Sequence, residues 1–347
     1  MKRFTAAVLA VSAASLMFAI LSPRGALGTG FLLVSPAMRS QGMGSVGAAD
    51  DSDPANVFFN PAFIASARGA FFTAAYNSSS FDYTPTSTID TYTYSIGAGA
   101  GFERALGEDM TGRFGVGVRY DAFSSEESFA NSTPYNDDEN YVSFTIGAGC
   151  WIGDALYGCF GLALKPWREK FGFPPAAESS KTAYDLGFMT RMRILRTDKM
   201  TLSSGLGVSF LNLGGGISPG YVLPKTYRYG LALNFEEGSS QYCREHFCVE
   251  VPVLAASIDY DYVYDQSQTG TGYGDEWGLG AEVAFFQILF LRAGYDYLGK
   301  NQDYPSFGVG ISIGYQDFRA RIDIANVGQV EGNATTDKYG LSLDFNY

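Results

Sequence analysis

The chain has 347 residues, of which 36 are acidic and 24 are lysine or arginine. Three of the bases lie in the first 28 residues, so the rest of the chain has 21 bases against 36 acids and a net charge of −15. A polyanion with no basic stripe is unsuited to nucleic acid, which we exclude as a partner. Glycine is abundant at 42 residues, and tyrosine and phenylalanine reach 23 and 27. This composition is typical of many strands in close backbone contact.

The first 28 residues have the features of a secretory signal peptide. Lys2 and Arg3 precede an apolar run over 6–21, and Ala26-Leu27-Gly28 supplies the small residues that a signal peptidase recognises. The alternative is an uncleaved anchor helix, for which the apolar run is short. No later window reaches about 18 uninterrupted apolar residues, so we expect no further transmembrane helix.

Residues 42–62, GMGSVGAADDSDPANVFFNPA, begin with a match to G-x-G-x-x-G and continue with a run of acids. A dinucleotide loop needs a strand before the glycines, a helix after them and an acid about 20 residues later. Pro36 interrupts the approach and no strand–helix–strand unit follows, so we reject a phosphate loop. Asp50, Asp51 and Asp53 also lack the spacing and closing glutamate of an EF-hand calcium loop. We expect these acids to cap or solvate a short turn.

After residue 65 the hydrophobic pattern has a period of two. In FGVGISIGYQ, the odd positions over 307–315 are all apolar, and the even positions over 308–316 are all small or polar. Such runs indicate half-buried strands. We predict fourteen of them, over 66–77, 90–105, 111–122, 139–153, 156–166, 181–194, 200–212, 225–237, 248–264, 275–286, 288–298, 305–315, 318–326 and 337–347.

The connections between these strands alternate between long and short. NSSSFDYTPTSTID and AFSSEESFANSTPYNDDEN are long, whereas LGEDM, GDA and RTDK are short. A soluble sandwich has no reason to keep its long loops at one end, but an outer-membrane barrel has short periplasmic turns and long outer loops. We therefore predict an all-β fold, a transmembrane antiparallel barrel of about 14 strands over 66–347. The inward charges that would line its wet lumen are Arg119, Asp185, Arg191, Arg193, Arg228, Arg319, Arg321 and Asp323.

The four cysteines suit an oxidising compartment. Cys150 and Cys159 flank the GDALYG turn, and Cys243 and Cys248 bracket CREHFC. We favour these two local disulfides over free, buried thiols. A metal site from Cys243, His246 and Cys248 is an alternative, but such close spacing more often belongs to a loop disulfide. His246 is the only histidine and is expected on the periplasmic side. A nucleophile–base pair is therefore missing, and we predict that the protein is not an enzyme and needs no cofactor.

Several short motifs resemble the PorV/PorQ-type family of the FadL-like outer-membrane proteins. The segment SPAMRSQGMGSVGAADDSDPANVFFNPAFIA is similar to that family's N-terminal segment, and FLNLGGG with LPKTYRYGLAL is similar to a second motif. The chain departs from the family in its Gly44-Ser45 turn, in ending with Tyr347 where phenylalanine is commoner, and in having cysteines. The matching residues of the first segment are Arg39, Gly42, Gly44, Asp51, Asn60, Pro61 and Ala62.

The resemblance implies a fourteen-stranded barrel with a hatch over 29–65 tucked into its lumen. An ordinary flexible linker is the alternative explanation for the hatch glycines. The implied location is the outer membrane of a Gram-negative-type cell, with outer-membrane lipid and the barrel-assembly machinery as partners. The implied role is a secretion-associated or structural barrel engaging exported proteins, and the alternative is a transporter of hydrophobic small molecules such as fatty acids or aromatics. The expected C-terminal insertion signal is Tyr339, Leu341, Leu343, Phe345 and Tyr347.

Overall fold

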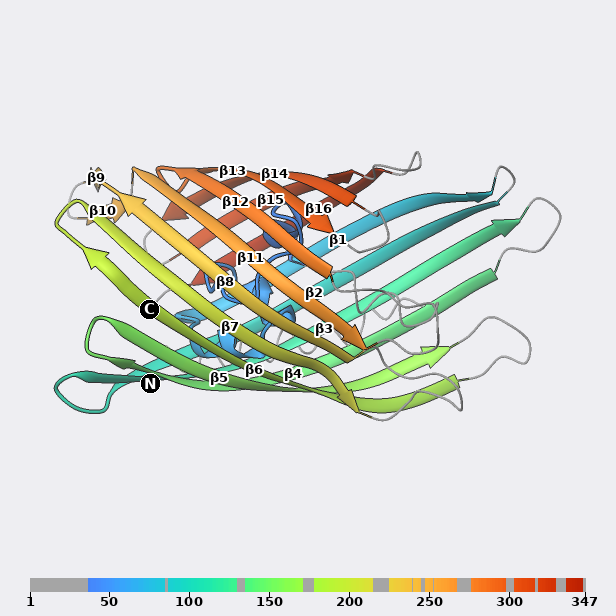
Figure 1. Cartoon of the computed structure of the whole chain (residues 1–347), viewed down its shortest axis with the longest axis horizontal. Coiled ribbons are helices and arrows are strands. Elements are labelled where there is room, and N and C mark those ends of the chain that lie inside the picture. Colours follow the sequence, from blue (N-terminus) through green and yellow to red (C-terminus); the bar gives the residue numbers. More distant parts are fainter. Residues whose placement is uncertain are drawn as a thin grey trace.

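The computed structural model describes residues 37–84, 87–129, 135–170, 178–214, 225–238, 240–244, 247–251, 253–266, 276–297, 303–315, 318–328 and 335–345. Within them, fourteen antiparallel strands form one closed barrel, as the period-two pattern predicted (Figure 1). A separate two-stranded sheet consists of β9 Ser240–Arg244 and β10 Phe247–Val251. The barrel strands are β1 Gly69–Thr84, β2 Ser87–Ala105, β3 Met110–Phe129, β4 Tyr135–Ile152, β5 Leu156–Lys170, β6 Glu178–Arg196, β7 Met200–Gly214, β8 Lys225–Glu237, β11 Leu254–Gln266, β12 Glu276–Phe285, β13 Leu289–Tyr297, β14 Asp303–Tyr315, β15 Phe318–Gly328 and β16 Thr335–Phe345.

The barrel closes because β1 has a hydrogen-bonded neighbour on each edge. Ala70 lies opposite Ala100 of β2 on one side and opposite Phe345 of β16 on the other. Closure leaves no strand edge with unpaired backbone groups, which is the condition for a sheet surrounded by hydrocarbon. The barrel prediction is confirmed, and the alternative of a β-sandwich is excluded.

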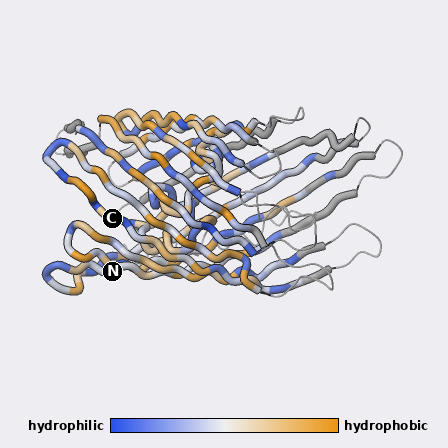
Figure 2. Tube along the Cα trace, viewed as in Figure 1, coloured by the Kyte–Doolittle hydropathy of each residue, from blue (hydrophilic) through white to orange (hydrophobic). Residues whose placement is uncertain are grey.

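Side chains alternate between a buried lumen face and an exposed outer face. In β14, Phe307 and Ile311 are 63% and 54% exposed, whereas Gly308, Gly310 and Ser312 between and beside them are buried. The outer face is therefore apolar, and the polar and small residues face inward, the reverse of a soluble protein's pattern. Figure 2 shows the hydrophobic colour distributed along the strands and the hydrophilic colour at the tips of the short turns.

Strands β1 to β4 are longer than predicted. β3 continues to Phe129 and β4 begins at Tyr135, and the two pair as far as Glu127 opposite Tyr135. The serine, threonine and aromatic residues that suggested loops therefore extend strands, because each strand continues where a neighbour pairs its backbone. Figure 1 shows these strands projecting beyond the rest at the end opposite the short turns.

The predicted ninth strand, 248–264, is two elements. β10 ends at Val251 and pairs with β9, and the barrel strand β11 begins only at Leu254. The sequence places Pro252 between them. Proline has no backbone N–H to donate to a ladder, which favours a break in the strand at this point. This one-strand prediction was wrong.

Three short helices precede β1 and lie inside the barrel: α2 Met38–Gln41, η2 Pro54–Phe58 and η3 Pro61–Ala65 (Figure 1). Asp53 and Asn60 begin the last two, since each side chain accepts a hydrogen bond from the N–H two residues later and each is followed by proline. The signal peptide predicted over 1–28 lies outside the described residues. Among those residues, no helix is both long and apolar enough to cross a membrane.

Candidate functional site

The N-terminal segment lies in the lumen and packs against its wall. We use "hatch" for its described part, residues 37–65. Met43 and Phe59 in the hatch are fully buried. Phe63 and its neighbours pack on Tyr157 and Met189 of the wall. Because apolar hatch side chains are buried against the wall, the hatch is part of the folded core and does not resemble a flexible linker.

Glycines on the lumen face bring the hatch backbone into direct contact with the wall. A Cβ on Gly161 would overlap the carbonyl of Pro61, and one on Gly115 would overlap the carbonyl of Ile64. No side chain except hydrogen fits at such positions. The same overlap, with backbone of the hatch or of the adjoining Ala67, or with the capping Oδ1 of Asn60, is found at several wall glycines. These are Gly101, Gly115, Gly161, Gly187, Gly205, Gly207, Gly278, Gly280 and Gly294.

Arg39 joins the hatch to the wall through a buried ion pair. Its Nε and Nη2 donate to the two oxygens of Glu282 in β12, each at 3.0 Å, and Nη2 also donates to Ser257 at 3.2 Å. Nη1 pairs with Asp50 of the hatch itself. The Arg39 side chain is 2% exposed. A bidentate, fully desolvated guanidinium–carboxylate pair fixes the orientation of both groups.

The ion pair of Arg39 extends along the wall as a chain of alternating charges. Glu282 also accepts from Nε of Arg292 at 2.5 Å, and Nη1 of Arg292 donates to Asp323 at 2.6 Å. Asp323 then accepts from Arg321 at 2.8 Å, and Arg321 pairs with Asp53 of the hatch. The chain therefore begins and ends in the hatch. Three strands contribute to it: β12, β13 and β15.

Backbone groups of the hatch are also bound by the wall. Asp261 of β11 accepts from the N–H groups of Gly47 and Ala48 at 2.9 and 3.0 Å, and it pairs with Arg228 at 3.3 Å. Arg228 in turn donates to the carbonyl of Ser45 at 3.0 Å. These contacts satisfy hatch groups that would otherwise be buried without partners.

A second buried polar cluster lies between β3 and β7. Nε of Arg119 donates to Asp121 at 2.6 Å. Lys165 pairs with Asp185 at 2.7 Å and donates to Asn212 at 2.8 Å. Asn212 has a φ of 58° where the β6–β7 register shifts between Tyr184 and Leu186, and its N–H donates to Asp185. The contacts of this cluster stabilise the register shift between β6 and β7 in the barrel wall.

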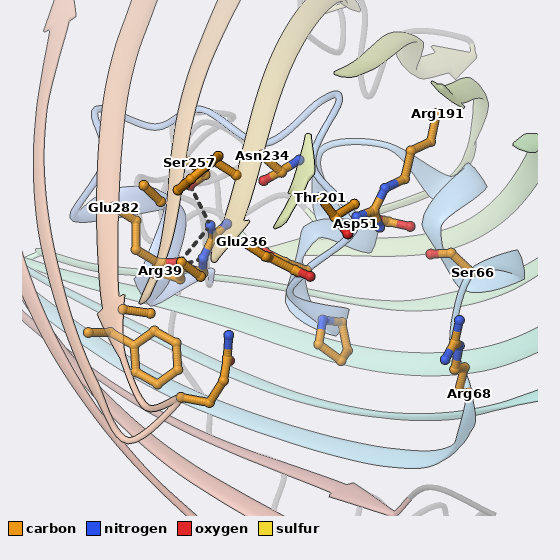
Figure 3. Close-up of a pocket in the computed structure, with 18 of the residues that line it drawn as sticks. Arg39, Asp51, Ser66, Arg68, Arg191, Thr201, Asn234, Glu236, Ser257 and Glu282 are labelled. Atoms are coloured by element: carbon orange, nitrogen blue, oxygen red, sulfur yellow. Dashed lines mark hydrogen bonds and ion pairs between the residues drawn. The ribbon is translucent and has the colours of Figure 1, made fainter. Parts of the chain in front are cut away.

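A cavity of about 610 Å³ lies between the hatch and the short-turn end of the barrel (Figure 3). Its lining includes Arg196, the last residue of β6, and Gln287 in the turn between β12 and β13. The acidic lining residues are Asp51, Glu236 and Glu282. The basic ones are Arg39, Arg68, Arg113, Arg191, Arg193, Arg196, Arg319 and Arg321.

The two arginines of the N-terminal segment differ in their electrostatic surroundings. Burial by itself would lower the pKa of Arg39, but Asp50 and Glu282 outweigh it and raise that pKa well above its usual value. The pKa of Arg68 is lowered, first by partial burial and then by the nearby positive charge of Arg113. Arg39 is therefore a permanent cation held by its partners, whereas Arg68 is a partly buried cation beside another cation.

The structure brings the resemblance residues of the N-terminal segment into contact with the wall. Arg39 is placed as described above, and Asp51 pairs with Arg191 at 3.1 Å. Gly44 has a φ of +73°, and its N–H donates to Ser306. Gly42 lies against Gly308, and Pro61 lies over Gly161. Asn60 caps η3 and donates to the carbonyl of Phe188. Ala62 is fully buried.

The eight predicted lumen charges all occupy inward-facing positions or the cavity lining. Arg193 donates to the carbonyl of Asp154 at 2.5 Å near the rim. Sequence reasoning missed Glu282, Arg292 and Asp261, although their even spacing with small neighbours on one strand face was visible. It could not find the cavity, which depends on which strands close around the hatch. The predicted eight are Arg119, Asp185, Arg191, Arg193, Arg228, Arg319, Arg321 and Asp323.

The predicted Cys150–Cys159 disulfide is wrong. Both are free thiols; Cys150 lies opposite Gly158 and Cys159 opposite Gly149, so their side chains point to opposite faces of the sheet. The alternative of a free, buried thiol describes Cys159, which is 8% exposed.

The other cysteine pair stays a prediction. Cys243 and Cys248 are opposite one another in the β9–β10 hairpin, which suits a cross-strand pair. His246 of the alternative metal site lies outside the described residues. Within those residues, no group of three or more His, Cys, Asp or Glu side chains is arranged to hold a metal ion.

The predicted C-terminal signal lies in the strand that closes the barrel. Tyr339, Leu341, Leu343 and Phe345 belong to β16, where they pair with β1 and β15. Tyr347 lies outside the described residues. The insertion role of this strand stays a prediction.

Comparison with known structures finds barrels of the same fold. The toluene transporter TbuX of Ralstonia pickettii is 13% identical, with a TM-score of 0.53 over 91% of this chain and 100% of that one. A TodX deltaS2S3 mutant monoaromatic hydrocarbon channel is 13% identical, with a TM-score of 0.53 over 90% of this chain and 99% of that one. The CymD monoaromatic hydrocarbon channel is 14% identical, with a TM-score of 0.50 over 91% of this chain and 99% of that one. No protein-family model matches the chain, and no curated protein does. These likenesses establish the fold.

Proposed function

We propose that the protein is an outer-membrane channel that admits small hydrophobic compounds, with the hatch as its barrier. The observation that carries this proposal is an ordered hatch held inside the lumen by backbone contacts and buried ion pairs. A barrel of this size without a plug would be an aqueous channel. A plugged one restricts passage to solutes that find a route past the plug, as a selective channel requires.

The outer surface supports a membrane location for the barrel. Exposed apolar side chains are spread over the outer faces of β3 to β8 and β11 to β15, including Phe144, Phe188, Leu231 and Ile313. Exposed apolar surface of this extent is stable only in contact with hydrocarbon or a partner. The export signal predicted over 1–28 supports the same location.

The similarity of fold to these channels supports transport as the proposed function. TbuX is a toluene transporter, and TodX and CymD are monoaromatic hydrocarbon channels. At 13–14% identity they support a class of solute by analogy only. The secretion-associated role that the PorV/PorQ resemblance implies stays a prediction. We propose no catalytic role.

Uptake by whole cells tests the proposal. We expect a Gram-negative host expressing the protein to take up radiolabelled toluene faster than the same host with an empty vector. A hydrophilic disaccharide is the control solute, and its uptake should not change. Equal toluene uptake with and without the protein, when the barrel is folded in the outer membrane, would contradict transport. Toluene and disaccharide accelerated together would indicate an unselective pore.

A further inference from the structure

One side of the cavity gathers guanidinium groups around an indole ring. Arg113 of β3 and Arg193 of β6 lie over Trp151 of β4, with their Cζ atoms 5.9 and 5.4 Å from the ring centroid. Arg68, directly before β1, and Arg191 of β6 line the same cavity. Figure 3 shows Arg68 and Arg191 on one side of it. Residues from four separate parts of the chain thus converge on one space.

These four arginines outnumber their counter-ions. Arg191 pairs with Asp51 at 3.1 Å, and Arg113 pairs with Glu103 at 2.8 Å, a carboxylate that is itself 53% exposed. Two cations have no carboxylate partner among the described residues.

Those two cations are Arg193 and Arg68. Among the described residues, Arg193 donates only to a backbone carbonyl, that of Asp154. Arg68 makes no hydrogen bond or ion pair with any described residue. Its pKa is lowered, first by burial and then by the nearby positive charge of Arg113. This local excess contrasts with the net charge of −15 over residues 29–347.

We propose that the cavity binds an organic carboxylate. The carboxylate would accept hydrogen bonds from Arg68 and Arg193, because the planar guanidinium matches a carboxylate in a bidentate arrangement. Its apolar body would contact Trp151 and Phe71, which also line the cavity. The volume of about 610 Å³ is in the range of small-molecule sites. The aromatic lining favours an organic acid over an inorganic anion.

Calorimetric titration of the full-length barrel in detergent tests this site. The probes are benzoate, its neutral isostere benzamide, and inorganic phosphate. The test variant is Arg68→Gln, which removes a charge that has no described partner. The matched control is Arg104→Gln, an exposed arginine at the same end of the barrel that does not line the cavity.

We expect benzoate to bind the unmodified protein, and Arg68→Gln to weaken its affinity about tenfold, the effect of losing one charge-assisted hydrogen bond. Arg104→Gln should leave the affinity unchanged, and benzamide should not bind. Folding of each variant is checked by heat-modifiable migration.

Three results would overturn the proposal: no benzoate binding by the folded barrel, equal benzoate affinity for Arg68→Gln and the unmodified protein, or phosphate affinity matching that of benzoate. The last would indicate a simple anion site. Because binding is measured without a membrane, the result is independent of whether toluene uptake is observed.

Discussion

Removing Arg39 should release the hatch from the wall. In Arg39→Ala, Asp50 loses its ion-pair partner, while Glu282 keeps Arg292 at 2.5 Å. Breaking a buried pair by removing one partner costs about 3–5 kcal/mol. We take the lower end, about 3 kcal/mol, because Glu282 keeps a partner and Asp50 still accepts from the N–H and hydroxyl of Ser52. A change of this size raises the population of the undocked hatch about 100-fold.

Limited proteolysis with chymotrypsin measures that population. Phe58 and Phe59 lie in the hatch and are 8% and 0% exposed, so cleavage there requires undocking. When docking is fast relative to cleavage, the rate follows the undocked fraction. Cleavage in Arg39→Ala should therefore be about 100-fold faster, and planar-bilayer recordings should show more frequent open events. The exposed Arg104→Ala is the control. If Arg39→Ala is cleaved and conducts like the unmodified protein, the ion pair does not hold the hatch.

Three further predictions concern the wall. Gly161→Leu should displace the hatch by overlap with Pro61, at a cost of about 1–3 kcal/mol, and raise liposome permeability. Gly158→Leu in the same strand, where a Cβ meets nothing within 4 Å, should leave liposome permeability unchanged. Equal permeability of the two variants would contradict close packing of the hatch against Gly161. Ile311→Arg on the outer face should lower the free energy of unfolding in lipid by about 2–4 kcal/mol. Asn234→Arg in the cavity should lower it by less. The reverse order would show that the outer and lumen faces are assigned the wrong way round. Unheated samples should migrate differently from heated ones on gels, as a closed barrel requires, and identical migration would argue against the barrel.

The barrel could be predicted from sequence because its signal is repeated. Every strand alternates, as at Phe307 and Ile311, and lipid outside with a wet lumen inside imposes the same pattern fourteen times. The strand limits were less predictable. Ser and Thr residues in the first four strands have no preference strong enough to separate loop from strand, and the break before Leu254 depends on one proline.

The hatch contacts could be predicted only in kind. Acids at Asp50, Asp51 and Asp53 and inward arginines suggested opposite charges in one lumen, but not which pairs form. Pairing such as Arg321 with Asp53 depends on register across closed strands and on the depth of the hatch. The free thiols show the same limit, because a difference of one residue in register reverses the face on which Cys159 lies.

The most direct test of the central claim is the conductance of a barrel without its hatch. Deleting residues 30–55 and keeping residues 1–29 removes Arg39, Asp50 and Asp53, and leaves the wall strands intact. We expect the truncated protein to insert, to show heat-modifiable migration, and to conduct ions in a planar bilayer well above the level of the full-length protein. A truncated barrel that inserts but conducts no better than the full-length one would show that the segment does not plug the lumen.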